Sequence, residues 1–470
     1  MTPRRSRRGV CIVGGRNQAG KPLFASTAPF VEGARPPAPS HGIMVNLNTD
    51  DAQITMGAPV TPSTRTDTPV APAAPQDTVR LTPYALLCIG LLIALGFSLG
   101  CSEFIVIGIQ PEIARDFGVP LSQAGMLMSV FSITYAIATP ILALSTGRIP
   151  RRTLLIGYSV LFCAGNSAAV LATSFEMLLA ARVLIGLVSG ALLAIGATYI
   201  PELAGMKRIS ICISLVYAAF SIAMVISTSA GKFIAATWEW HYAVIGTLAM
   251  SLVVCAVLIL VLPRTGATDI PATAREQMPL LRDPRIIAGT AIFMFGVGSI
   301  YVFYGYVTPY IENILGMGTL EASGALMAYG GMCFASNLLS GWCDARFGVK
   351  TMLVSFPIQA VLLFGLWAVG PAMPWALAII LGIALTMYVV STPCISLFMT
   401  TAAEEYPQAL TLASSLEPTA FNVGIAFGTA VGGAVISGPG MPYVGLVGAA
   451  FSLVAWALAA LTVRLATKRR

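Results

Sequence analysis

The chain has 470 residues, of which 56% are hydrophobic and only 10% are charged. Soluble domains carry about a quarter charged residues, so this composition excludes an ordinary soluble protein and indicates one that crosses a membrane many times. The net charge of +7 does not indicate a nucleic-acid partner, because nine of the 27 basic residues lie in the first 80 positions and most others fall in alternate loops.

Residues 1–80 are rich in Pro, Ala, Thr and Gly and show no apolar period, so we expect a disordered, cytoplasmic N-terminal tail. Long apolar runs follow, and a helix needs about 20 mostly apolar residues to cross a bilayer. The runs are 83–109, 121–145, 153–174, 177–200, 209–234, 242–262, 286–311, 320–341, 351–370, 374–400, 410–435 and 442–463. Strands of a membrane barrel would instead alternate with period two. We therefore predict an all-α polytopic membrane protein with twelve transmembrane helices.

The chain also contains an internal repeat. When it is shifted on itself by 198 residues, Pro111 meets Pro309, and the end of helix 1, helix 2 and the next loop match their counterparts six helices later. Because an even number of helices separates the two copies, both have the same orientation in the membrane. We predict two parallel six-helix bundles at 81–262 and 286–465, a cytoplasmic linker at 263–285 and a basic tail at 466–470.

Beyond residue 80, the basic residues gather in alternate loops and in the C-terminal tail. This is the positive-inside pattern, and it places both termini in the cytoplasm. Two of these loops, "TGRIPRR" and "DARFGVK", occupy matching places in the two repeats. They act either as gating loops or as simple topology anchors, and their candidate residues are Arg148, Arg152, Asp344, Arg346 and Lys350.

Two parallel six-helix repeats are the layout of major facilitator transporters, which place the substrate site between the halves. The two basic loops resemble the loop motif of that superfamily, although Gly147 replaces its first acidic residue and Asp344 comes one place early. The stretches "CSEFIVIGIQPEIA", "ARVLIGLVSGALLAIGA" and "FNVGIAFGTAVGG" resemble the twelve-helix drug:proton antiporter group, in particular its sugar-efflux and arabinose-type exporter branch.

This resemblance implies proton-coupled efflux of a small neutral or cationic organic compound, such as a sugar or drug, across the bacterial inner membrane. It implies a monomer in the lipid bilayer, with protons as the coupling ion and without a cofactor. The fifth helix departs from the family pattern, because Ser227 and Ser229 in "VISTSAGKF" replace Gly and Pro. That departure keeps open a proton-independent facilitator or uptake carrier. We do not expect an enzyme, since the chain has only two His and lacks loop clusters of catalytic residues.

Glu103 and Arg182 are the main candidates for a functional site. Each lies about six residues from the predicted outer end of its helix, which corresponds to roughly 9 Å at 1.5 Å per residue. Charges inside a membrane face a bundle interior or an aqueous cavity, and they usually pair. We expect Glu103 to carry the proton and Arg182 to adjust the proton affinity of Glu103. These are the roles that the family resemblance implies for the two positions. The alternatives are an acid that reaches the outer headgroups and an arginine that only fixes helix 4.

Five further residues are candidates for the substrate cavity: Tyr301, Tyr304, Asn166, Asn422 and Glu417. The repeat makes Tyr301 the counterpart of Glu103, which favours a position in the cavity. The alternatives are an aromatic belt at the membrane interface for the tyrosines, helix-to-helix hydrogen bonds for the asparagines, and either an interfacial acid or a second protonatable site for Glu417. No metal site is expected.

Overall fold

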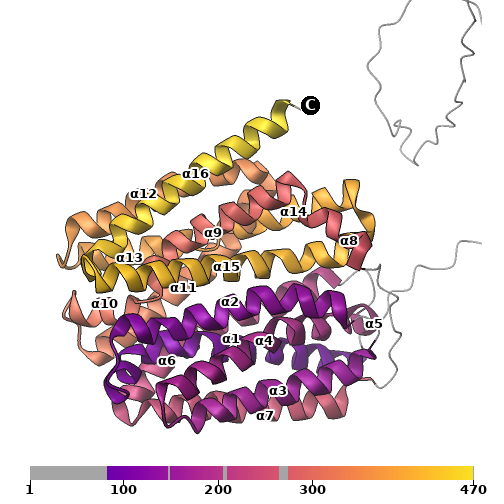
Figure 1. The fold of residues 1–470 in the computed structure, drawn as a ribbon, viewed down its shortest axis with the longest axis horizontal. Coiled ribbons are helices and arrows are strands. Elements are labelled where there is room, and N and C mark those ends of the chain that lie inside the picture. Colours follow the sequence, from indigo (N-terminus) through magenta and orange to yellow (C-terminus); the bar gives the residue numbers. More distant parts are fainter. Residues whose placement is uncertain (1–81, 147–148, 205–208, 264–273, 469–470) are drawn as a thin grey trace, which may run out of the picture. The chain divides into compact units, whose positions relative to one another are not determined.

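The computed structural model describes residues 82–146, 149–204, 209–263 and 274–468, and regular secondary structure in these residues is entirely helical (Figure 1). The predicted N-terminal tail lies outside the described residues. The helices of the first half are α1 (Pro83–Asp116), α2 (Leu121–Ser145), α3 (Arg151–Val170), α4 (Phe175–Ala197), α5 (Ile200–Ala204), α6 (Ile209–Thr237) and α7 (Trp240–Val261).

The helices of the second half are α8 (Ala274–Leu281), α9 (Pro284–Tyr304), α10 (Val307–Asn313), α11 (Thr319–Phe347), η2 (Gly348–Lys350), α12 (Thr351–Val369), α13 (Trp375–Thr386), α14 (Ser391–Glu405), η3 (Pro407–Ala409), α15 (Leu410–Ser437), η4 (Met441–Tyr443) and α16 (Val444–Lys468). Helix α8 lies in the predicted linker. Helix α16 runs through Lys468, so the described part of the predicted basic tail is helical.

Eleven stretches of the described residues are long and apolar enough to cross a membrane. One of them, Thr319–Val369, has 51 residues and consists of α11 and α12 joined by the short η2. Counted as two, these helices give twelve crossings, so the prediction of an all-α protein with two six-helix bundles is confirmed. Pro83 and the end of α16 lie at one end of the bundle, which we call the proximal end. The opposite end, where α1, α6 and α10 finish, is the distal end.

The two halves repeat one another as the sequence predicts. Shifted by 198 residues, the start of α2 falls on the start of α11, and α1 falls on the pair α9 and α10. The counterpart of the unbroken α1 is therefore interrupted near Gly305, where the chain turns between α9 and α10. This interruption gives the second half a short distal helix, α10, that the first half lacks.

The halves meet along two pairs of helices. Helix α2 lies beside α15, and α11 lies beside α6 (Figure 1). Hydrogen bonds cross this boundary. Asn337 Nδ2 donates to Ser221 Oγ at 2.9 Å, and the hydroxyl oxygens of Ser129 and Thr429 are hydrogen-bonded at 2.6 Å. Within the first half, α1 packs closely against α6 at Gly108, which lies against the backbone of Thr228.

Asp283 fixes the start of the second half at the proximal end. Its carboxylate caps α9 by accepting from the Arg285 backbone N–H at 2.8 Å, and it also accepts from the Arg285 guanidinium at 2.8 and 3.1 Å. Arg285 reaches Glu405 at the end of α14, at 2.8 Å. The hydrogen bonds from the Arg285 side chain are the largest influence that lowers the pKa of Asp283, with its backbone N–H adding to the effect.

We expect Asp283→Asn to destabilise the protein at neutral pH by about 1 kcal/mol, because asparagine still caps the helix but lacks the charge of the partly exposed ion pair with Arg285. Since the folded state lowers the pKa of Asp283, its contribution is complete above the pKa of the unfolded chain, about 4, and is lost as the pH falls through the folded value. The variant should therefore lose less stability than the wild type on acidification below about pH 4. Thermal unfolding in detergent at pH 7 and pH 3.5 measures both effects; an equal loss on acidification in the two proteins would contradict the prediction.

Candidate functional site

Glu103 lies deep inside the bundle. Its side chain is 1% exposed, and neither carboxylate oxygen has a hydrogen-bond partner among the described residues. The predicted end of this helix at residue 109 was wrong, because α1 continues through Pro111 to Asp116. Thirteen residues separate Glu103 from Asp116, which corresponds to about 20 Å along the helix. Because its side chain is also buried, Glu103 is an interior residue of the bundle.

Arg182 lies against the same part of α1. Its guanidinium donates to the backbone carbonyls of Ser102 at 2.7 Å, Glu103 at 2.9 Å and Leu127 at 3.2 Å. The ring of Phe131 lies below the guanidinium, with 4.5 Å between the ring centroid and Cζ. The structure therefore brings Glu103 and Arg182 together, but the contact that it shows is to the peptide oxygen of Glu103 and not to its carboxylate. Arg182 joins α4 to α1 and α2 and keeps its charge beside the acid.

Asn166 belongs to the same neighbourhood through its amide. Ser102 Oγ donates to Asn166 Oδ1 at 2.7 Å, and Asn166 Nδ2 donates to the carbonyl of Phe162 at 2.9 Å. Both amide atoms are therefore occupied by protein groups, and the side chain ties α3 to α1. In this conformation Asn166 bonds helix to helix, the alternative that the sequence left open.

The second half presents a group of aromatic side chains towards Glu103, which we call the tyrosine face. It consists of Tyr301, Tyr304, Tyr329, Tyr388 and Phe421, all of them buried. Tyr304 and Tyr329 stack at 4.8 Å, Tyr388 and Phe421 stack at 5.5 Å, and Tyr301 meets both pairs edge-on. These rings form one continuous surface inside the bundle.

The tyrosine face lies at the boundary between the halves. Tyr388 Oη donates to Met224 Sδ on α6 of the first half at 3.3 Å. Tyr301 and Tyr388 are close enough to Glu103 to interact with it electrostatically. The Tyr301 hydroxyl has no partner among the described residues, as is also true of the Glu103 carboxylate. Two repeat-related residues therefore place polar groups without partners in the same interior region.

Glu417 and Asn422 lie farther along α15. Asn422 Nδ2 donates to the carbonyl of Pro418 in its own helix at 3.1 Å, and its Oδ1 has no partner among the described residues. Glu417 is half-buried and adjoins Pro418 in the chain. Like Glu103, it interacts electrostatically with Tyr388, a residue of the tyrosine face.

The candidate gating residues lie at the proximal end, away from this site, and Arg148 lies outside the described residues. Arg152 donates to the carbonyls of Ile259 and Leu262 at 3.1 and 3.2 Å, which ties α3 to the end of α7. Asp344 accepts from Ser396 Oγ at 2.6 Å. The guanidinium of Arg346 lies over the rings of Trp342 and Phe347, and Lys350 is exposed. Each contact named here stays within one half.

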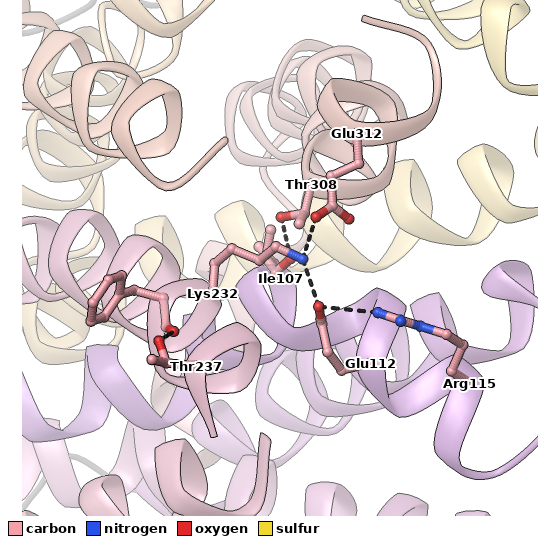
Figure 2. A network of polar contacts seen from close by, with 8 residues as sticks. Ile107, Glu112, Arg115, Lys232, Thr237, Thr308 and Glu312 are labelled. Carbon is pink, nitrogen blue, oxygen red and sulfur yellow. Dashed lines mark hydrogen bonds and ion pairs between the residues drawn. The ribbon is translucent and has the colours of Figure 1, made fainter. Parts of the chain in front are cut away.

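The sequence did not identify an ion cluster at the distal end. Lys232 on α6 is 1% exposed, and its Nζ lies 2.6 Å from Glu112 Oε1 on α1 and also pairs with Glu312 on α10 (Figure 2). Arg115 lies 3.5 Å from Glu112 at the exposed edge of the cluster. A cavity of about 550 Å³ opens beside these residues. Sequence position marked Lys232 only as a residue near a helix end, where solvated charges are common.

Two bundles of six membrane-crossing helices, with buried charges and aromatic rings where they meet, define a transporter that spans the membrane. The model of the Major Facilitator Superfamily matches residues 91–417, so the chain belongs to this family. Its members are secondary transporters, and the protein is accordingly a membrane transporter and not an enzyme.

Known proteins of the family resemble the chain over most of its length. It is 28% identical to the uncharacterized MFS-type transporter YtbD of Bacillus subtilis, over 75% of this chain and 89% of that protein. It is 26% identical to a chloramphenicol resistance protein of Streptomyces lividans, over 71% and 85%. Among solved structures, a bacterial homologue of the human lysosomal transporter Spinster matches with a TM-score of 0.62 and 18% identity, over 83% of this chain and 99% of that chain. The last comparison shows the fold alone.

Proposed function

We propose that the protein exports a small neutral or cationic organic compound in exchange for protons, by alternating access between its two halves. Glu103 is the coupling residue, Arg182 positions it, and the tyrosine face contacts the substrate. The positive-inside pattern supports an orientation with both termini in the cytoplasm, and the bacterial relatives support the inner membrane.

The observation that carries this proposal is the buried carboxyl of Glu103, whose oxygens have no partner in the described part of the chain. An ionised carboxylate in an apolar site is costly unless it is paired or hydrogen-bonded. The guanidinium of Arg182 offsets part of this cost, although its hydrogen bonds go to peptide oxygens. Any rearrangement at the boundary between the halves, or a substrate against the tyrosine face, changes these surroundings. Proton occupancy of Glu103 is thereby linked to conformation and to substrate.

Substrate-induced proton release from purified protein in weakly buffered detergent solution tests this link. The panel contains sugars, nucleobases and hydrophobic drugs, and chloramphenicol is included because of the resistance protein among the relatives. We expect one class of compound to release protons from the wild type and none from Glu103→Gln, which keeps the size of the side chain and removes its acid.

Glu176→Gln is the matched control, because it removes an exposed carboxyl from the first turn of α4, the helix that also carries Arg182. It should release protons like the wild type. Proton release from Glu103→Gln at the wild-type level would exclude Glu103 as the coupling residue.

A proton-independent facilitator is the second candidate. It is favoured by α6, which runs without interruption from Ile209 to Thr237 and has Ser227 and Ser229 where related antiporters have Gly and Pro. In this case the substrate would bind wild type and Glu103→Gln equally, and neither protein would release protons. The same measurement therefore separates the two candidates.

A further inference from the structure

We infer that Lys232 and Glu312 form a latch that holds the distal ends of the two halves together, and that the distal side opens only when this ion pair separates. The inference uses the transporter fold and does not depend on which compound is carried or on whether Glu103 transfers protons.

The two carboxylates around Lys232 have different parts in the latch. Glu112 on α1 and Lys232 on α6 belong to the same half, and their 2.6 Å contact keeps the ammonium group in place. Glu312 on α10 belongs to the other half, so its ion pair with Lys232 is the one that crosses the boundary (Figure 2). Relative rotation of the halves that parts their distal ends must stretch this second pair and can leave the first intact.

Helix α10 carries a second contact across the same boundary. The hydroxyl of Thr308, whose side chain is fully buried, donates to the carbonyl of Ile107 on α1 at 2.6 Å (Figure 2). Thr308 and Glu312 are four residues apart, so they project from the same face of the helix. One face of α10 is thus bonded to α1 and α6 of the opposite half through a hydroxyl and a carboxylate.

The surroundings explain how such a latch is strong yet reversible. Lys232 is 1% exposed. If its ammonium group lost the Glu312 carboxylate without gaining contact with water, the buried charge would be poorly compensated. The adjacent cavity is lined by polar and charged side chains, among them Asp116, Glu239 and His241. Water entering from this cavity as the ends part can solvate the separated charges.

Accessibility of a buried reporter measures the state of the latch. Each variant is combined with Thr308→Cys, a change that nearly conserves size and keeps a weak donor, and is reconstituted in nanodiscs and alkylated with a membrane-impermeant maleimide. The described native cysteines are buried or half-buried, and protein without the reporter supplies their background.

We expect the reporter to react at least about tenfold faster in Glu312→Gln, since about 1.4 kcal/mol of lost attraction shifts a population tenfold. Lys232 keeps its partner Glu112 in this variant, so the first half is not disturbed. Arg115→Gln is the matched control: it removes an ion pair of the same cluster that lies within α1, and its reporter should react at the unmodified rate.

Equal reporter rates in Glu312→Gln and Arg115→Gln, with complete labelling after denaturation, would overturn the latch. If Glu312→Gln elutes as aggregate, Glu312→Asp keeps the charge and shortens the side chain by one methylene. In Glu312→Asp the reporter should be alkylated faster than in the protein with Glu312 intact, but more slowly than in a protein whose distal side is open. An unchanged alkylation rate in a monodisperse sample would again overturn the inference.

Discussion

Gly108→Ala is expected to destabilise the protein by at least about 3 kcal/mol, at the upper end of what overpacking costs. A Cβ at this position would lie inside van der Waals contact with the carbonyl oxygen of Thr228, and the carbonyl carbon would be only 3.0 Å away. These are backbone atoms of α6 and cannot rotate aside, so α1 and α6 must separate. The displacement would also pull Glu112 away from Lys232, four residues farther along each helix.

Gly90→Ala is the control for this effect, because it makes the same change in the same helix. Its added Cβ meets nothing within 4 Å, and the residue is exposed. Alanine favours a helix over glycine by about 0.5–1 kcal/mol, so this variant should unfold at or above the wild-type temperature. Heating both variants in detergent and following the monodisperse fraction by size exclusion compares them. Equal behaviour would show that α1 and α6 can move apart at little cost.

Phe131→Ala is expected to cost about 3–5 kcal/mol, the usual range when a buried aromatic side chain is truncated. Phe131 has no exposed surface, and its ring supports the buried guanidinium of Arg182. Removing the ring leaves a cavity and removes a cation–π contact that desolvation strengthens to about 2 kcal/mol. The temperature of unfolding in detergent should therefore fall well below that of the wild type.

Two further variants separate these causes. Phe131→Leu fills most of the cavity without a ring, so it should recover the packing part and not the cation–π part. Phe364→Ala removes a ring that is 49% exposed on α12, and we expect it to change stability little. A loss from Phe364→Ala as large as that from Phe131→Ala would mean that stability follows side-chain size and not burial beside Arg182.

The helices were predictable because each crossing requires a long apolar run, and such runs are visible without any knowledge of packing. The repeat also made the topology predictable, since Pro111 and Pro309, which match in the sequence, lie in helices that correspond in the structure. Helix ends were less certain. A proline commonly ends or kinks a helix, and the predicted end of α1 at residue 109 lies just before Pro111; in the structure the helix passes through it. That difference increased the number of residues between Glu103 and the distal end of α1 from about six to thirteen.

Contacts between distant helices could not be predicted from single positions. Glu103 and Arg182 were selected because a lone charge in an apolar run is conspicuous, but the direction of the guanidinium towards peptide oxygens depends on how α4 crosses α1. Lys232 and Glu312 were harder still. Each lies near a helix end, where charged residues are common. Their ion pair depends on the packing of α6 against α10, two helices that come from different halves.

Helix α8 has a consequence for the connection between the halves. Its Leu280 is fully buried in the core of the second half, and Asp283 caps the next helix, so this part of the predicted linker is docked on the second half. Helix α8 therefore belongs structurally to the second half, and a cut between the halves that keeps this docked segment in place belongs before Ala274.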